Sequence, residues 1–158
     1  MVTELPVRIE FALPAGWQAA PPDEVGAPGV AFVAVRPVPP GGFVTNLTIA
    51  GEIRDPAVRM ATIADESVSR VESVAESVRV RERADFSQGA APGLTQLLDI
   101  KQEGERLVQC QVYLPVDDVH GRRTVLELVL TCTAGRFDEV ASDFRRFVGT
   151  VRPVPARS

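Results

Sequence analysis

Very few side chains in this chain have the type and spacing that catalysis or metal binding needs. The only histidine, His120, closely follows Asp117 and Asp118 in a short stretch between two strand-like segments. One imidazole beside two carboxylates is an incomplete ligand set for a metal ion, and Asp-Asp before a glycine is ordinary turn chemistry. We therefore expect a solvated loop here and predict no metal site.

The two cysteines, Cys110 and Cys132, could form a disulfide, supply a nucleophile or belong to the core. If their strands pair as a hairpin, residue 128 lies opposite Cys110, four positions from Cys132. That separation, roughly 13 Å along a strand, is too long for a disulfide bond. Both residues fall on the apolar side of their strands, so we predict reduced core thiols, which suit a cytoplasmic protein.

Sequence motifs for nucleophilic catalysis and for cofactor binding are missing. The chain contains no Gly-x-Ser-x-Gly, no phosphate-binding Gly-x-x-x-x-Gly-Lys-Ser and no dinucleotide-binding Gly-x-Gly-x-x-Gly. We therefore predict that the protein is not an enzyme and binds no cofactor. An enzyme built from carboxylates alone is the alternative.

Size and charge describe an ordinary globular protein. The 158 residues carry a net charge of −4, which argues against a nucleic-acid partner. No stretch approaches the ~20 apolar residues that a membrane span needs, and the N-terminus lacks the pattern of a signal peptide. We expect one domain, residues 2–155, in the cytoplasm.

The elements that must position these side chains follow one another in the order βββαββββα. Strands alternate apolar and polar residues at period two, whereas helices place them at a period near 3.6. Asp55-Pro56 predicts a helix start, and Gly149 followed by Pro153 predicts the end of the last helix. The predicted strands are 7–11, 30–36, 43–53, 78–83, a segment containing Leu94, Leu98 and Ile100, 107–114 and 124–132, and the helices are 56–77 and 136–148.

This order predicts an α+β fold with a central antiparallel sheet of about six to seven strands flanked by two helices. Even-numbered residues of 107–114 and 124–132 form one wholly apolar face. An odd-length turn through Glu103–Glu105 adds Leu94, Leu98 and Ile100 to it. The opposite face is mixed, which predicts partial cover by the shorter, C-terminal helix or by a partner; it holds Leu107, Gln109, Gln111, Tyr113, Val125, Glu127 and Val129.

Charged residues give two further expectations. Arg79, Arg81 and Arg83 are placed on one face of their strand, where they either bind an anionic partner or protect an edge strand from pairing with another chain. We favour protection of the edge. On the long helix, Glu66 and Arg70 are expected to form an ion pair on the outer face.

Several short features occur together along nearly the whole chain. They are the opening strand followed by Leu13–Trp17, Asn46-Leu47 within strand 43–53, Asp55-Pro56 before the long helix, and Phe137, Phe144 and Phe147 in the last helix. This combination resembles the PsbP-like superfamily, which includes the photosystem II PsbP subunit, a Ran-binding import factor, and LpqN-like and DcrB-like proteins. The resemblance implies an antiparallel sheet with helices on both faces and a non-enzymatic role in binding or assembly.

We therefore expect a protein-binding module, acting as an adaptor or as a chaperone in secretion or assembly, with an unknown protein or a second copy as partner. The alternative is a carrier of a lipid or other small apolar ligand, in a cleft lined by the loops 18–29 and 36–42. Trp17, beside these loops, is either a core residue or an aromatic anchor at the rim of the cleft. The candidate partner-binding residues are Trp17, Gln109, Gln111, Tyr113, Val125 and Val129.

Overall fold

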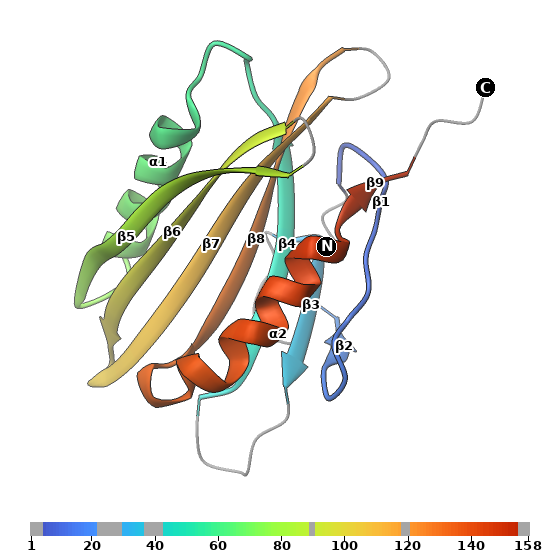
Figure 1. Ribbon diagram of the computed structural model, residues 1–158. Coiled ribbons are helices and arrows are strands. Elements are labelled where there is room, and N and C mark those ends of the chain that lie inside the picture. The colour runs from blue at the N-terminus through green and yellow to red at the C-terminus, as the bar shows by residue number, and fades with distance from the viewer. Residues whose placement is uncertain (1–4, 22–29, 37–42, 89–90, 118–120, 155–158) are drawn as a thin grey trace.

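A seven-stranded antiparallel sheet with the strand order β2-β3-β4-β8-β7-β6-β5 forms the centre of the protein (Figure 1). The computed structural model describes residues 5–21, 30–36, 43–88, 91–117 and 121–154. The strands of the sheet are β2 (Gln18–Ala20), β3 (Phe32–Arg36), β4 (Thr45–Ile53), β5 (Ser77–Gln88), β6 (Ala91–Gln102), β7 (Glu105–Asp117) and β8 (Arg123–Thr133). This sheet, with two α-helices, confirms the predicted α+β class.

The two helices, α1 (Met60–Glu72) and α2 (Phe137–Thr150), lie on opposite faces of the sheet (Figure 1). A short 3₁₀ turn, η1 (Ala134–Arg136), precedes α2. Within the described part of the chain, no helix is long and apolar enough to cross a membrane.

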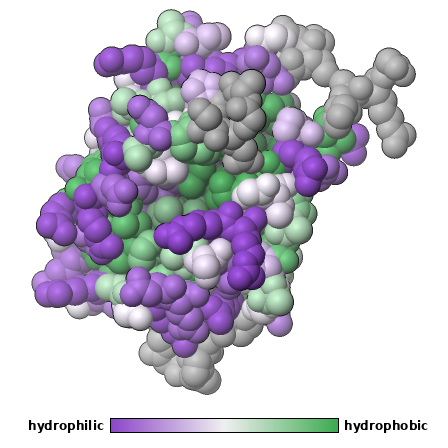
Figure 2. Space-filling model, in the orientation of Figure 1, coloured by the Kyte–Doolittle hydropathy of each residue, from purple (hydrophilic) through white to green (hydrophobic). Residues whose placement is uncertain are grey.

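The even-numbered residues of β7 and β8 form one apolar face, as predicted, but the helix that covers this face is α2, which was expected on the opposite face. Phe144 and Phe147 are almost fully buried there. They pack with the sheet residues of this core, which include Val108, Val112, Leu114, Leu126, Leu128, Leu130 and Cys132. Beyond the edge of α2, toward β5, apolar residues remain visible at the surface (Figure 2). Phe86, Leu97 and Cys110 are half-buried and pack against the α2 core.

Both helices differ from their predicted bounds. The Asp55 carboxylate accepts a hydrogen bond from the Ala57 amide at 2.8 Å, so it closes a turn before α1 instead of capping the helix. Helix α1 ends at Glu72, because β5 already begins at Ser77 and pairs with β6. Helix α2 continues through Gly149, so this glycine does not end it.

The turn between β6 and β7 contains two residues, not three. Glu103 and Gly104 both have positive φ angles, 51° and 77°, which is the conformation of a type I′ hairpin turn. Gln102 therefore pairs with Glu105, and Leu98 lies opposite Gln109. As a consequence, Leu94, Leu98 and Ile100 face α1, and the prediction that they share the α2 face is wrong.

The cysteines are free, as predicted, although the predicted pairing of β7 with β8 was shifted by two residues. Cys110 lies opposite Leu130, so Cys132 is only two positions away on the same face. The structure leaves both thiols free. Burial raises the pKa of each thiol to about 11, which keeps both protonated at neutral pH.

A β-bulge at Arg81 divides the predicted row of arginines between the two faces of the edge strand β5. Arg79 and Arg81 both bind Asp99 on the α2 face. Past the bulge, Arg83 pairs with Gln96 on the α1 face and forms an ion pair with Asp65 at 2.8 Å. The row therefore does not share one face, because the extra residue re-aims the side chains that follow it.

The N-terminal segment is arranged differently from the prediction. Only Ile9–Glu10 (β1) of segment 7–11 forms a strand, and it pairs with β9 (Arg152–Pro153) outside the central sheet. Residues 18–20, expected in a loop, form β2 and pair with β3. Trp17 is only 7% exposed in the α2 core, and its indole N–H donates to Asp143 on α2 at 3.0 Å.

Candidate functional site

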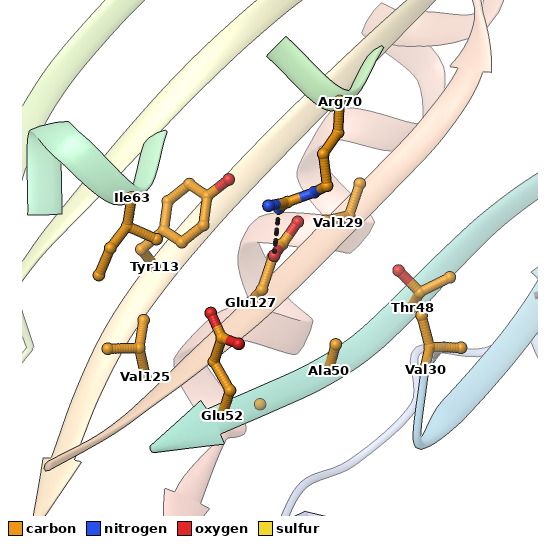
Figure 3. A pocket seen from close by; sticks show the side chains of 11 residues that line it. Val30, Thr48, Ala50, Glu52, Ile63, Arg70, Tyr113, Val125, Glu127 and Val129 are labelled. Atoms are coloured by element: carbon orange, nitrogen blue, oxygen red, sulfur yellow. Dashed lines mark ion pairs between the residues drawn. The ribbon is translucent and has the colours of Figure 1, made fainter. Parts of the chain in front are cut away.

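Helix α1 covers only part of its face of the sheet, and a hollow of about 380 Å³ lies beside it. The helix contacts β5 and β6, and it packs on β7 through Ile63, Ala64 and Tyr113. The hollow lies where β4 and β8 continue beyond the helix (Figure 3). Its lining is about equally polar and apolar and includes two carboxylates and one guanidinium. The lining residues are Val30, Thr48, Ala50, Gly51, Glu52, Ile63, Arg70, Tyr113, Val125, Glu127 and Val129.

The pairing of β4 with β8 explains why the hollow exists. Ala50 lies directly opposite Glu127, and Glu52 lies opposite Val125. Side chains two positions apart on a strand lie on the same face, and residues directly opposite each other share that face. Ala50, Glu52, Val125 and Glu127 therefore all point to the α1 side. The methyl group of Ala50 is too small to fill the space beside Glu127, so the carboxylate extends into the hollow (Figure 3).

Glu127 is the most unusual ionisable group of this site. Burial raises the pKa of its carboxyl group; Arg70 acts in the opposite direction, and Glu52 adds to the rise. The ion pair with Arg70 spans 3.6 Å, and the Arg70 side chain is 59% exposed. A pair so open to water compensates a buried charge weakly, so Glu127 is incompletely neutralised.

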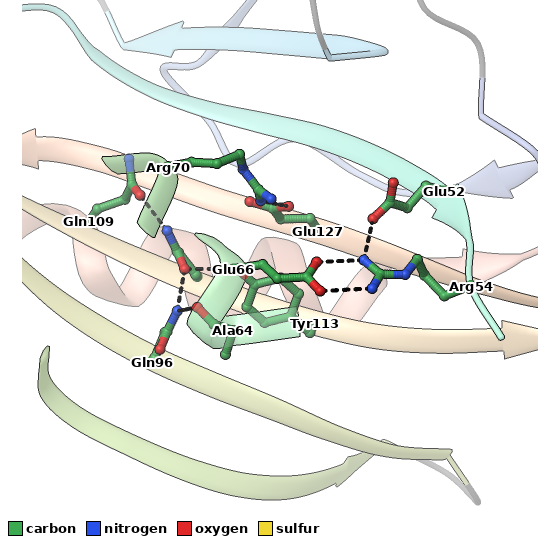
Figure 4. Close-up of polar contacts among 10 residues, drawn as sticks. Glu52, Arg54, Ala64, Glu66, Arg70, Gln96, Gln109, Tyr113 and Glu127 are labelled. Atoms are coloured by element: carbon green, nitrogen blue, oxygen red, sulfur yellow. Dashed lines mark hydrogen bonds and ion pairs between the residues drawn. The ribbon is translucent and has the colours of Figure 1, made fainter. Parts of the chain in front are cut away.

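Arg54 holds the end of β4 against α1 at one side of the hollow. Its guanidinium donates to both carboxylate oxygens of Glu66, at 2.8 and 2.9 Å, and to Glu52 at 2.9 Å (Figure 4). The hydrogen bonds from Arg54 lower the pKa of Glu66. The expected Glu66–Arg70 ion pair is therefore replaced by two pairs to the sheet, Arg54–Glu66 and Arg70–Glu127.

Polar side chains under α1 form a continuous hydrogen-bond network (Figure 4). Gln96 donates to the Ala64 carbonyl at 3.1 Å and to Gln111 at 2.6 Å. Gln111 donates to Gln109 at 2.5 Å and accepts the Tyr113 hydroxyl at 2.8 Å. Because buried polar groups need partners, this network explains the mixed polarity of the face. The covering helix is α1, not the C-terminal helix as predicted.

The structure brings together only some of the predicted partner-binding residues. Tyr113, Val125 and Val129 line the hollow. Gln109 and Gln111 belong to the adjoining network, whereas Trp17 lies in the core of the opposite face. Tyr113 and Gln111 are 0% and 1% exposed, so they can support a site more readily than they can contact a partner.

Sequence reasoning did not select Glu127, Arg70, Glu52 or Ala50 as site residues. One signal was present, because Glu127 is the only charged residue between Thr124 and Thr133 in an otherwise apolar strand. The other predicted regions, most of the loops 18–29 and 36–42 and the stretch around His120, lie outside the described residues. Within the described part of the chain, no group of three or more His, Cys, Asp or Glu residues is placed to hold a metal ion.

Comparisons with known proteins identify the fold and leave the activity open. No family model matches the sequence, and no curated protein matches it. Among solved structures, LpqN of Mycobacterium tuberculosis, involved in cell envelope biogenesis, aligns with a TM-score of 0.73 at 10% identity, over 95% of this chain and 86% of LpqN.

Two further solved structures are similar. The cyanobacterial PsbP (CyanoP) of Synechocystis sp. PCC 6803 aligns with a TM-score of 0.59 at 13% identity, over 92% of this chain and 86% of its own. The Ran-binding protein Mog1p of Saccharomyces cerevisiae aligns with a TM-score of 0.57 at 10% identity, over 91% and 89%. At such low identity the likeness concerns the fold alone. The chain therefore has the PsbP-like fold that its short sequence features predicted.

Proposed function

We propose that residues 2–155 act as one non-enzymatic binding domain in the cytoplasm, and that the hollow beside α1 receives part of a partner protein. One observation carries this proposal. Glu127 extends into the hollow, where its side chain is only 25% exposed and its carboxylate is weakly paired. A buried and poorly compensated charge is costly, and a partner that supplies its counter-charge would remove that cost.

The arrangement of the two carboxylates favours binding over catalysis. Acid–base catalysis needs a proton donor or acceptor within reach of a reacting group, and glycosidases use a pair of carboxyl groups that both face the substrate. Here Glu52 is engaged by Arg54 at 2.9 Å. Glu127 is therefore the one carboxylate of the hollow that is available, and a single such group suits recognition.

The comparisons support an adaptor or assembly role at the level of the fold. Mog1p is a Ran-binding protein, and LpqN is involved in cell envelope biogenesis. We carry over only the general role, an adaptor or a chaperone-like protein that contacts another polypeptide. A second copy of this chain is one candidate partner.

A carrier of a small ligand is the second candidate function. The volume of about 380 Å³ lies at the low end of the range for small-molecule sites, about 300–1,000 Å³. The exposed Arg70 and the carboxylate of Glu127 would disfavour a purely apolar ligand such as a lipid chain, because these polar groups would lose water without gaining a partner.

The test is to fill the hollow with a bulky side chain. Ala50→Trp places an indole opposite Glu127, and Ser142→Trp places the same side chain on an exposed position of α2 as the matched control. We expect any co-purifying partner, or any dimer that the unmodified protein forms in size-exclusion chromatography, to be lost with Ala50→Trp and kept with Ser142→Trp. Thermal melts verify that both variants fold. Equal recovery of the partner with both variants would contradict the proposal.

A further inference from the structure

The charges that line the hollow are unbalanced. At and beside the hollow, three carboxylates, those of Glu52, Glu66 and Glu127, share the two guanidiniums of Arg54 and Arg70. Arg54 donates a hydrogen bond to Glu52, but it also donates to both carboxylate oxygens of Glu66. Among the described residues, the counter-charge of Glu127 is therefore Arg70. The hollow has room for one more positive group.

Arg70 has the features of a counter-ion that can be displaced. Its nitrogen lies 3.6 Å from the Glu127 carboxylate, longer than the 2.7–2.9 Å or so of a direct charge-assisted hydrogen bond. Arg70 lies in the last turn of α1, and its side chain is 59% exposed. It can therefore turn into solvent with little loss, because an exposed ion pair contributes at most about 1 kcal/mol.

The walls of the hollow suit the carbon chain of a long basic side chain. Val30 and Ala50, which are partly exposed, and Val129, which is 8% exposed, supply apolar surface to the hollow (Figure 3). Lysine and arginine bury their methylene groups along such surface while their charged ends reach a polar partner. An anionic group would instead meet two carboxylates in a partly desolvated space, where like charges repel strongly.

We propose that the hollow binds an arginine or lysine side chain of a partner polypeptide, which displaces Arg70 and becomes the counter-charge of Glu127. The neighbours of that side chain are apolar, matching the walls. This inference rests on the proposed function, because it names the chemistry of the group that enters the same hollow.

The first experiment compares two peptides that differ only in charge. The probes are acetyl-Val-Arg-Val-amide and its twin with citrulline, a neutral side chain of nearly the same shape. They are titrated into the ¹⁵N-labelled full chain and followed by NMR. We expect the arginine peptide to shift the amides of Ala50, Glu127 and Val129 saturably. The citrulline peptide should bind about tenfold or more weakly, because a hydrogen bond to a charged group contributes about 1.5–3 kcal/mol. Equal affinities, or no saturable shift with the arginine peptide, would overturn the inference.

The second experiment changes the two charges in opposite directions. Glu127→Gln should abolish the preference for arginine over citrulline. Arg70→Gln should strengthen binding of the arginine peptide several-fold, because the internal competitor is gone. Matched controls are Glu105→Gln and Arg145→Gln, at exposed positions outside the lining, and both should leave the affinity unchanged. Weaker binding of the arginine peptide to Arg70→Gln would overturn the inference, because it would show that Arg70 helps to bind the occupant instead of competing with it.

These outcomes separate the inference from the proposed function. Loss of the cellular partner with Ala50→Trp, together with equal binding of the two peptides, would leave the hollow as the binding site and reject a basic occupant. A partner that is unaffected by Ala50→Trp would instead reject the hollow itself. The peptide comparison uses the unmodified protein, so its result does not depend on whether a variant folds.

Discussion

Glu127 is the residue at which the local sequence and the tertiary environment disagree most. Its neighbours on β8 are apolar or hydroxylated, and the strand is buried along most of its length. A carboxylate at this position costs desolvation energy, and Arg70 repays only part of it through a solvent-exposed ion pair. A residue that lowers stability and is only partly compensated inside the protein marks a place where a partner can bind.

The raised pKa of Glu127 predicts a particular pH dependence of stability. In the folded protein this carboxyl holds its proton to higher pH than in the unfolded chain. The folded state therefore binds more protons, and the free energy of unfolding falls as the pH rises above about 4.5, the ordinary value. Glu127→Gln should remove this loss, so that the variant is at least as stable as the unmodified protein at pH 7.

Urea unfolding at a series of pH values between 4 and 8 or so measures this effect. Glu105→Gln serves as the control, because Glu105 is exposed and should not alter the pH profile. A Glu127→Gln protein clearly less stable than the unmodified chain at neutral pH would show that the Arg70 ion pair outweighs the desolvation.

At the scale of elements, a two-residue turn decides which helix the strand β6 faces. Glu103 and Gly104 adopt positive φ angles, and the strands that they join continue in register from Gln102 and Glu105. A turn longer by one residue would move every side chain of β6 to the other face. The turn thereby directs Leu98, which is 0% exposed, toward α1.

Substitutions in this turn should change stability in a predictable direction. Gly104→Ala should lower the free energy of unfolding by about 1 kcal/mol, because an alanine in the left-handed region is strained even where space is free, as it is at Gly104. Glu103→Asn should raise it, since asparagine tolerates positive φ better. The measurement is urea unfolding.

Gly149→Ala is the matched control for the turn variants. Gly149 lies within α2, and nothing lies within 4 Å of an added Cβ atom. The same chemical change should therefore stabilise the protein there, by about 0.5–1 kcal/mol. Opposite signs at the two glycines would confirm the turn conformation, and equal signs would contradict it.

Across the whole molecule, the two faces of the sheet are covered unequally. Helix α2 forms one core with the N-terminal segment, through contacts such as the Phe11 and Phe147 rings, whose centroids lie 5.5 Å apart. Helix α1 lies over one side of the other face and leaves the hollow above β4 and β8. The site that we propose results from this incomplete cover and not from any local motif.

Hydrogen exchange should follow the strand order. Strands β7 and β8 lie at the centre, paired on both sides along most of their length, so their amides should exchange slowest. The edge strands β5 and β2 should exchange first, since each has one unpaired side in the described sheet. Mass spectrometry of exchanged peptides measures this, and equal protection of β5 and β8 would contradict the sheet order.

The sequence by itself determined the class of the fold, the helix α2 and one face of the sheet. All three follow from local patterns. The phenylalanine residues of α2 recur at helical spacing, so only a helix buries them together, and the apolar residues of β7 and β8 alternate, so only paired strands bury them on one face. The short features that resemble the PsbP-like superfamily agreed with the observed fold. Tyr113, Val125 and Val129 were also selected correctly as residues of one face.

Only the tertiary structure decided where the candidate site lies. The hollow depends on which β4 residue faces Glu127, on how far α1 reaches across the sheet, and on the turn that directs β6 toward α1. These relations join residues far apart in the chain, such as Ala50 and Glu127. Strand pairing and helix placement depend on how entire faces of the sheet pack together. A shift of one residue in the strand register moves every side chain of that strand to the other face. No local pattern carries that information.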